Sequence, residues 1–137
     1  MKNTNEKNGS ILELKKEFPA LFIAYEDWYK KEEFAKERGK ASCPSISIVP
    51  ESVYKTWEQQ QTLLGKDDEV PTAQEVVAAI IKTGIGKSPI SFYVRTSSIS
   101  AGNHVYVGIV SGKISIYDGY DDCIANVGVV KKSEPQK

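Results

Sequence analysis

Hydrophobic and polar residues follow a helical period in the first part of the chain. Between Ile11 and Trp28 the apolar residues recur three or four positions apart, which places them along one stripe of a helix. Ser10 and Glu13 have the spacing of a capping box, so the helix is predicted to begin there. Pro19 lies inside the pattern and lacks a backbone donor, which predicts a kink or a short helix that restarts with Pro19 in its first turn.

Two more helices are predicted before residue 85. The segment Pro50–Ser52 is expected to begin a helix that ends at Gly65. Thr72 and Glu75 form a second capping box, followed by the apolar face of a third helix that Gly84 ends. Because these segments follow the first helix closely, the N-terminal half is predicted to hold about three helices.

After residue 89 the hydrophobic pattern changes to a period of two, which is the period of a half-buried strand. One face of the first such strand would carry Ile90, Phe92 and Val94, and the other would carry Ser91, Tyr93 and Arg95. A polar turn region is expected at Ser97–Asn103.

The densest apolar stretch, His104–Asp122, reads as a hairpin of two strands. These strands, Val105–Val110 and Lys113–Tyr117, would be joined at Ser111-Gly112. A short strand at Ser45–Val49 and a last one at residues 124–130 complete the pattern.

The order of these elements predicts an α+β fold. A helical N-terminal half would pack on one face of an antiparallel sheet of four to five strands, which come mainly from the C-terminal half. The polar residues 1–9 and 131–137 are expected to be disordered tails on either side of a single domain, residues 10–130.

Composition and charge narrow the class of protein. The 18 basic and 18 acidic residues cancel, so no net charge draws the chain to nucleic acid or to an anionic membrane. No signal-peptide pattern and no membrane-length apolar run is present in the sequence. The two cysteines, Cys43 and Cys123, are too few and too far apart for a disulfide framework. We therefore expect a cytoplasmic protein that needs no cofactor.

Residues 72–96 resemble the helix-turn-helix family of DNA-binding proteins in outline. A capped helix is followed by a glycine turn and by Ser88 and Pro89, which suit the start of a second helix. The resemblance implies a recognition helix there, with the later strands as the wing of a winged helix. The side chains that would approach phosphates are Lys82, Lys87 and Arg95. Residues 88–96 are compatible with a helix or a strand, so nucleic-acid binding stays an alternative.

A second alternative rests on Cys43, His104 and Asp118. A strand-borne histidine, followed by Gly-Lys and by an aspartate on the next strand, resembles the histidine hairpin of papain-like thiol hydrolases. The resemblance implies that His104 deprotonates Cys43 while Asp118 orients the imidazole. Cys43 precedes Pro44 and a predicted strand, whereas the cysteine of that family begins a helix.

The acidic turn that ends the hairpin raises a third possibility. Three carboxylates, on Asp118, Asp121 and Asp122, could hold a hard cation through oxygen ligands. The alternate spacing of a calcium-binding loop is absent, which favours a solvated Asp-Gly turn instead.

Tyrosines supply the hypothesis that we favour from the sequence. Large, rigid rings beside an arginine often anchor protein interfaces, and the outward face of the sheet is expected to carry such a set. Its members are Tyr93, Arg95, Tyr106, Tyr117 and Tyr120. The sequence thus favours a small non-enzymatic protein that binds another macromolecule, most simply a protein, in the manner of an inhibitor, an immunity protein or a phage- or plasmid-type accessory factor.

Overall fold

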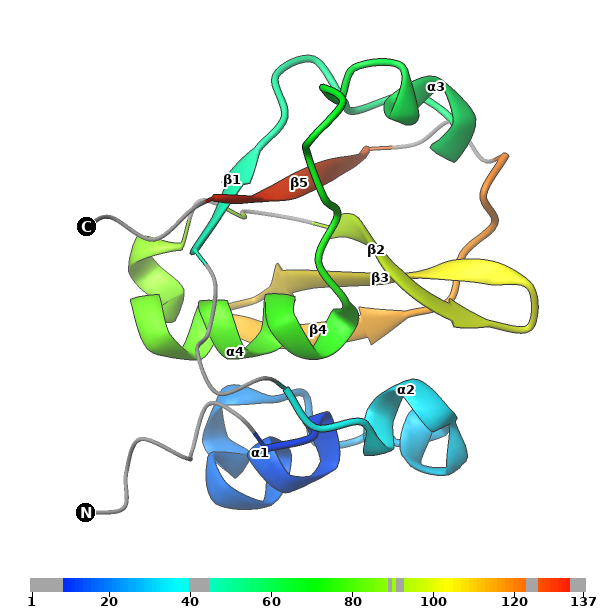
Figure 1. Cartoon of the computed structure of the whole chain (residues 1–137). Helices are drawn as coiled ribbons and strands as arrows, with labels where there is room; N and C mark the ends of the chain where they lie inside the picture. Colours follow the sequence, from blue (N-terminus) through cyan, green and yellow to red (C-terminus); the bar gives the residue numbers. More distant parts are fainter. Residues whose placement is uncertain (1–8, 40–44, 89, 91–92, 123–125, 134–137) are drawn as a thin grey trace.

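The computed structural model describes residues 9–39, 45–88, 90, 93–122 and 126–133. Within them, one sheet of five strands forms the centre of the molecule (Figure 1), in the order β1-β5-β2-β3-β4. The strands are β1 (Ser45–Ile48), β2 (Tyr93–Ser100), β3 (Asn103–Val110), β4 (Lys113–Tyr117) and β5 (Val127–Ser133). The predicted α+β class is confirmed. The sheet is mixed rather than wholly antiparallel, because β5 lies parallel to β2 after the chain crosses back from β4.

Two tight turns connect the three central strands. Ser111 and Gly112 have φ values of 53° and 76°, as a two-residue hairpin turn requires, so the predicted β3–β4 hairpin is confirmed. A second turn of this kind, at Ala101-Gly102, joins β2 to β3. This turn lies within the polar turn region predicted over residues 97–103, but that region was predicted too long, since β2 continues to Ser100 and β3 begins at Asn103.

Buried hydrogen bonds explain why those polar residues extend a strand. The Thr96 hydroxyl donates to the Val105 carbonyl over 2.9 Å, and the Ser98 hydroxyl accepts from the Ala73 amide, also over 2.9 Å. These partners replace the hydrogen bonds to water that the hydroxyl groups lose when they are buried in the sheet.

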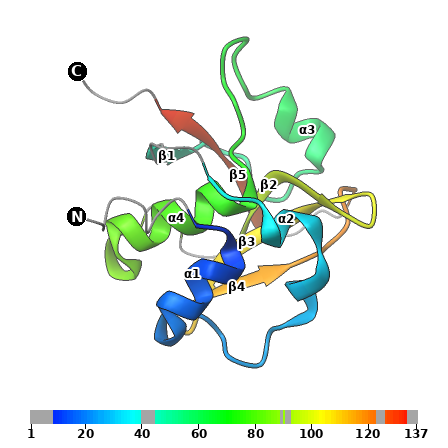
Figure 2. The same cartoon turned by 60° about the horizontal axis from the view of Figure 1, so that its bottom comes forward.

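Helices cover one face of the sheet, as Figure 2 shows. Ala73–Thr83 forms α4, which begins at the predicted capping box and ends at Gly84, where φ is 97°. The helical stripe predicted from Ile11 to Trp28 does not form one continuous helix. Residues 11–36 divide into α1 (Ile11–Glu17), the 3₁₀ turns η2 (Pro19–Leu21) and η3 (Trp28–Lys31), and α2 (Glu33–Lys36). Pro19 does begin a new turn, but Tyr25 is 85% exposed and lies off any helical stripe.

The helix predicted to begin at residues 50–52 starts later. Glu51 and Tyr54 have φ values of 63° and 59°, which the α-helix cannot accommodate. Thr56 and Gln59 form the actual capping box, and α3 covers only Trp57–Gln61. After α4, the 3₁₀ turn η4 (Ile85–Lys87) leads toward β2.

The hydrophobic core lies between the sheet and the helices α1, α2 and α4. Strand residues that face it include Val94, Val107 and Ile116, and the helices contribute Leu14 and Ile80, all buried. The opposite sheet face carries Tyr93 and Arg95 of β2, as the alternation predicts.

Residues 23–28, which lead into η3 and include its first residue, cover the outer edge of β4. The Ile23 amide donates to the Ile114 carbonyl over 3.2 Å, and the Trp28 indole donates to the Ile116 carbonyl over 2.9 Å. Glu26 accepts from the Ile116 amide over 3.0 Å. An edge satisfied in this way is protected against pairing with another chain.

At the other end of the sheet, β5 extends three residues past the predicted end of the last strand. Lys131 and Lys132, which the sequence assigned to a tail, lie in this strand. Lys132 contacts Glu69 and Glu75, each at 3.2 Å. The predicted residues 124 and 125 lie outside the described part of the chain.

Candidate functional site

The candidate site lies on the sheet face that points away from α1 and α4. Arg95, Tyr106 and Tyr117 form one cross-strand row on β2, β3 and β4 in register. Tyr93 stands opposite Gly108 in the next row. Because glycine has no side chain, the ring of Tyr93 can lie across β3 toward Ser115.

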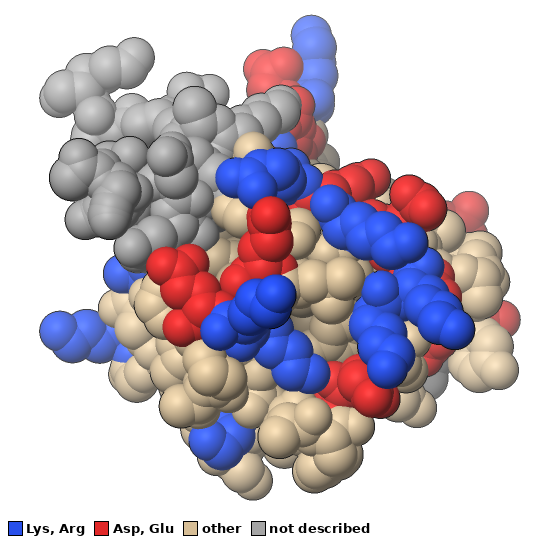
Figure 3. All heavy atoms as spheres, turned by 90° about the horizontal axis from the view of Figure 1, so that it is seen from below, with Lys and Arg blue, Asp and Glu red and all other residues tan. Residues whose placement is uncertain are grey.

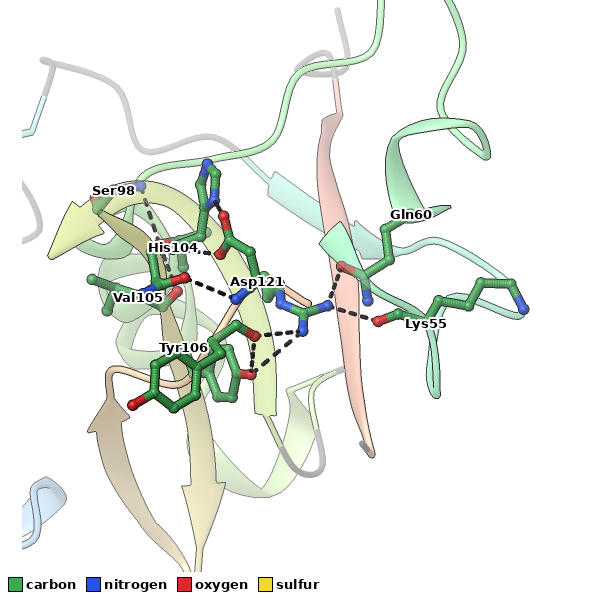
Figure 4. Close-up of polar contacts among 11 residues, drawn as sticks. Lys55, Gln60, Ser98, His104, Val105, Tyr106 and Asp121 are labelled. Atoms are coloured by element: carbon green, nitrogen blue, oxygen red, sulfur yellow. Dashed lines mark hydrogen bonds and ion pairs between the residues drawn. The ribbon is translucent and has the colours of Figure 1, made fainter. Parts of the chain in front are cut away.

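Arg95 is fully buried, which corrects the prediction that it is part of an exposed surface. Figure 4 shows Lys55 and Gln60, from α3 and the segment that leads into it, facing the side of the sheet that carries Tyr106. Arg95 Nη1 donates to the Lys55 carbonyl over 2.8 Å and to Gln60 Oε1 over 2.9 Å. Nη2 donates to the Tyr120 carbonyl over 3.1 Å and faces the Tyr106 hydroxyl at 3.4 Å. Arg95 therefore joins the covering segments to the sheet and does not present its charge to a partner.

The rings of Tyr93, Tyr106 and Tyr117 form a cluster beside this arginine. Their centroids lie 5.9 to 6.2 Å apart, with tilts of 43° to 54°, which is a favourable range for aromatic pairs. The Arg95 guanidinium carbon lies 5.4 Å from the centroid of Tyr106. The cluster is thus packed from one side by a buried cation.

Hydrogen bonds fix the hydroxyl groups of two of these tyrosines. The Tyr106 hydroxyl donates to the Tyr120 carbonyl over 3.1 Å. The Tyr93 hydroxyl lies 2.7 Å from Ser115 Oγ, and Ser115 donates to Glu26 Oε2 over 2.7 Å. Because Ser115 uses its proton on Glu26, Tyr93 must be the donor. Burial raises the pKa of Tyr93 despite this hydrogen bond, so the phenol stays neutral at physiological pH.

A pocket of about 580 Å³ opens next to the cluster. We call it the tyrosine pocket, and its named members are Tyr93, Asn103, Tyr106, Tyr117, Asp118, Tyr120 and Asn126. Tyr117 and Tyr120 stand at its rim, 54% and 69% exposed, whereas Tyr106 is buried in its wall. Four of the five residues predicted for a binding surface are therefore brought together, and Arg95 lies behind them.

Gly119 lies against the Tyr106 ring in the wall of the pocket. A Cβ atom at this position would lie 2.5 Å from the Tyr106 hydroxyl oxygen, closer than real contacts permit. The Asp-Gly turn was predicted from the sequence, but this close approach to a residue 13 positions earlier was not. Asn103 and Asn126 were likewise missed, because no local pattern marks them.

His104 contacts a different aspartate from the one predicted. Asp121 accepts from the His104 amide over 2.7 Å and from Nδ1 over 2.8 Å. The imidazole also stacks on Trp57, with centroids 3.6 Å apart and planes 16° apart. Asp118 has no hydrogen bond or ion pair within the described residues. The proposed role of Asp118 in orienting His104 is therefore wrong.

Both oxygens of Asp121 serve this histidine contact, while the Asp121 carbonyl accepts from the Trp57 amide over 2.8 Å. The pair holds the acidic turn and α3 against β3. Cys43, the predicted nucleophile, lies outside the described residues, and the predicted contact between Cys43 and His104 therefore lies outside them as well.

The acidic turn does not gather its carboxylates around a cation. Within the described residues, no group of three histidine, cysteine, aspartate or glutamate side chains could hold a metal ion. Asp121 turns toward His104, whereas Asp118 lines the tyrosine pocket and Asp122 borders a second hollow beside Trp57.

The elements predicted for nucleic-acid binding are not assembled. Tyr93 begins a strand, and no α-helix follows Gly84 before it among the described residues. Lys82 and Lys87 are exposed near the end of α4, whereas Arg95 is buried on the other side of the sheet. On the face that carries α1 and α2, Figure 3 shows acidic and basic side chains interspersed.

In the described part of the chain no helix is both long and apolar enough to cross a membrane. Comparison with protein-family models, with curated proteins and with solved structures gives no match. The function is therefore argued from the geometry of the site.

Proposed function

We propose that this protein acts by binding another protein, and that the tyrosine pocket receives an anchoring side chain of that protein. The observation that carries the proposal is a preformed pocket with two exposed tyrosines at its rim and two anchored tyrosines in its wall. Tyrosine is among the residues that contribute most to binding energy at protein interfaces. The protein would work in the manner of a small inhibitor, immunity protein or accessory factor.

Rigidity of the pocket supports this proposal. The hydroxyl groups of Tyr93 and Tyr106 are already hydrogen bonded, and Tyr117 packs on both rings. Association loses about 0.5–1.5 kcal/mol for each flexible side chain that it must order. Rings held in place before binding avoid most of that loss. The volume of about 580 Å³ also suits the side chains of a short partner segment.

Affinity purification from the cells that make the protein tests the proposal. The chain with Tyr117→Ala and Tyr120→Ala is compared with the native chain and with Tyr54→Ala. Tyr54 is 60% exposed but does not line the tyrosine pocket, so it is a matched control for loss of an exposed ring. We expect the native chain and the control to retain the same protein, and the double variant to lose it.

Thermal unfolding of the three chains shows whether the double variant is folded. Both substituted rings are more than half exposed, so most of its stability should remain. Retention of the same protein by a folded double variant would exclude the tyrosine pocket as the binding surface. Once a retained protein is identified, titration of the two purified proteins measures the loss of affinity directly.

A further inference from the structure

We infer that the group received by the tyrosine pocket is the cationic side chain of a lysine or arginine on a protein partner. This inference rests on the proposed function and adds the chemistry of the anchor. The observation behind it is that four tyrosine rings line the same pocket as Asp118, a carboxylate that has no basic partner among the described residues.

Charge complementarity favours a cation. Asp118 is the one charged side chain among the described residues that line the pocket. It is exposed, and no hydrogen bond or ion pair within the described residues occupies it. A carboxylate at the mouth of an otherwise neutral pocket attracts a cation and repels an anion.

The geometry of the rings also suits a cation. The centroids of Tyr93, Tyr106 and Tyr117 lie 5.9 to 6.2 Å apart, so the three rings line the pocket side by side, and the half-exposed ring of Tyr117 offers a face for a cation near the rim. The phenol hydroxyls of Tyr93 and Tyr106 donate to internal acceptors, so these two tyrosines offer ring surface rather than donors. A ring surface carries the negative part of the aromatic quadrupole, which attracts cations.

Arg95 limits where the cation can lie. Its guanidinium is already near Tyr106 and would repel a second positive charge there. Its charge is spread over contacts to four oxygen atoms, from Lys55, Gln60, Tyr106 and Tyr120. The favourable position is therefore toward the rim, where Tyr117, Asp118 and Tyr120 lie close together in the sequence and are all exposed.

Capped tripeptides that differ at one position test this inference without a known partner. The central residue is lysine, arginine, norleucine or glutamate, and binding is followed by NMR through the amide signals of residues 117–120. We expect saturable shifts with lysine and arginine at millimolar concentration, weakening with salt, and much smaller shifts with norleucine and glutamate. Equal or tighter binding of norleucine or glutamate, or no binding of any peptide, would overturn the inference.

Two substitutions separate the contribution of the carboxylate to peptide binding from that of the aromatic ring. Asp118→Asn removes the carboxylate and should weaken lysine peptide binding by up to about fivefold. Tyr117→Leu keeps an apolar side chain but removes the ring, and should weaken it by about two- to fivefold. Asp122→Asn, which changes a neighbouring carboxylate outside the pocket, should leave binding unchanged. If Asp118→Asn has no effect, the charge argument fails.

Two further results distinguish the inference from the function on which it rests. Binding of tetramethylammonium without binding of the peptides would assign the pocket to a small amine and would overturn the choice of a protein side chain. A partner that depends on Tyr117 and Tyr120, but not on Asp118 or on salt, would overturn the cation while the proposed function remains. A partner that is retained without the two tyrosines would remove both.

Discussion

At the scale of single residues, the site depends on side chains whose positions are set by distant contacts. Arg95 is buried because oxygen atoms from Lys55, Gln60 and Tyr120 converge on it. An arginine in an alternating strand is ordinarily expected at the surface, so the sequence predicted its face of the sheet but not its burial. The same holds for His104, whose acidic partner is Asp121 rather than Asp118. Several carboxylates follow the hairpin, and spacing alone could not choose among them.

Gly119 provides a residue-scale prediction. In Gly119→Ala, the new Cβ would lie 2.5 Å from Cζ and the hydroxyl oxygen of Tyr106. Tyr106 is buried and hydrogen bonded, so it cannot move aside freely. We expect a loss of about 1–3 kcal/mol in the free energy of unfolding, measured by urea denaturation.

Gly86→Ala is the matched control for that substitution. A Cβ atom at Gly86 would meet no atom within 4 Å beyond its chain neighbours, and the backbone there is not left-handed. Alanine should therefore leave the free energy of unfolding unchanged or raise it by less than about 1 kcal/mol. Equal effects of the two substitutions would show that the close approach of Gly119 to Tyr106 does not constrain the pocket.

At the scale of elements, the sequence predicted the helices and turns that are set by neighbouring residues, such as capping boxes and glycine turns. The capping box at Thr72 and the glycine at position 84 delimit α4, and Ser111-Gly112 delimits the β3–β4 hairpin. The conformation of residues 49–56, where the sequence predicted the start of a helix, depends instead on a contact that is distant in the sequence. Ser52 hydrogen bonds to the amide of Val129 on β5 over 3.0 Å, and neighbouring Glu51 adopts a left-handed conformation. A contact 77 positions away leaves no local pattern.

The cover over the edge of β4 yields a prediction at this scale. Glu26 accepts from both the Ile116 amide and the Ser115 hydroxyl, so Glu26→Ala leaves the Ile116 amide without its acceptor, while Ser115 can turn its proton to the Tyr93 hydroxyl. We expect a loss of about 2 kcal/mol in the free energy of unfolding. Hydrogen exchange at the Ile116 amide should become faster, because it no longer has an internal acceptor.

Asp27→Ala serves as the control, since it removes the next carboxylate along the chain. Asp27 is 66% exposed and pairs with Lys30 at 3.8 Å, a contact that should contribute little. Unchanged exchange at Ile116 in Glu26→Ala would show that Glu26 does not protect the edge strand.

At the scale of the whole molecule, the sheet lies between two unequal layers. Helices α1, α2 and α4 cover one face with an apolar core, as the periodicity predicted. The other face is partly covered by α3 and by the turn at residues 118–122, through polar contacts to Arg95 and His104. The second layer was not predicted, because its contacts are few, polar and distant in sequence. It is also the layer that forms one side of the tyrosine pocket.

This division predicts that the polar layer opens before the helical layer does. Asp121→Ala removes the acceptor for both the His104 amide and its ring, and so releases the turn that also carries Tyr120. We expect a loss of about 2–3 kcal/mol in the free energy of unfolding. Hydrogen exchange at the amides of His104 and Trp57 should rise, while buried amides of α4 keep the protection that global unfolding sets.

Asp122→Ala distinguishes this effect from a general loss of negative charge in the turn. Asp122 is exposed and has no hydrogen bond or ion pair within the described residues, so its removal should change neither stability nor exchange appreciably. Tryptophan fluorescence gives a second measure, because Trp57 stacks on His104 and gains solvent contact when the turn is released. If Asp121→Ala exposes α4 and Trp57 together, the two layers unfold as one unit, and the tyrosine pocket is as stable as the core behind it. If only Trp57 and His104 respond, the pocket depends on a layer that can open on its own, and the strength of partner binding is then coupled to the His104–Asp121 contact.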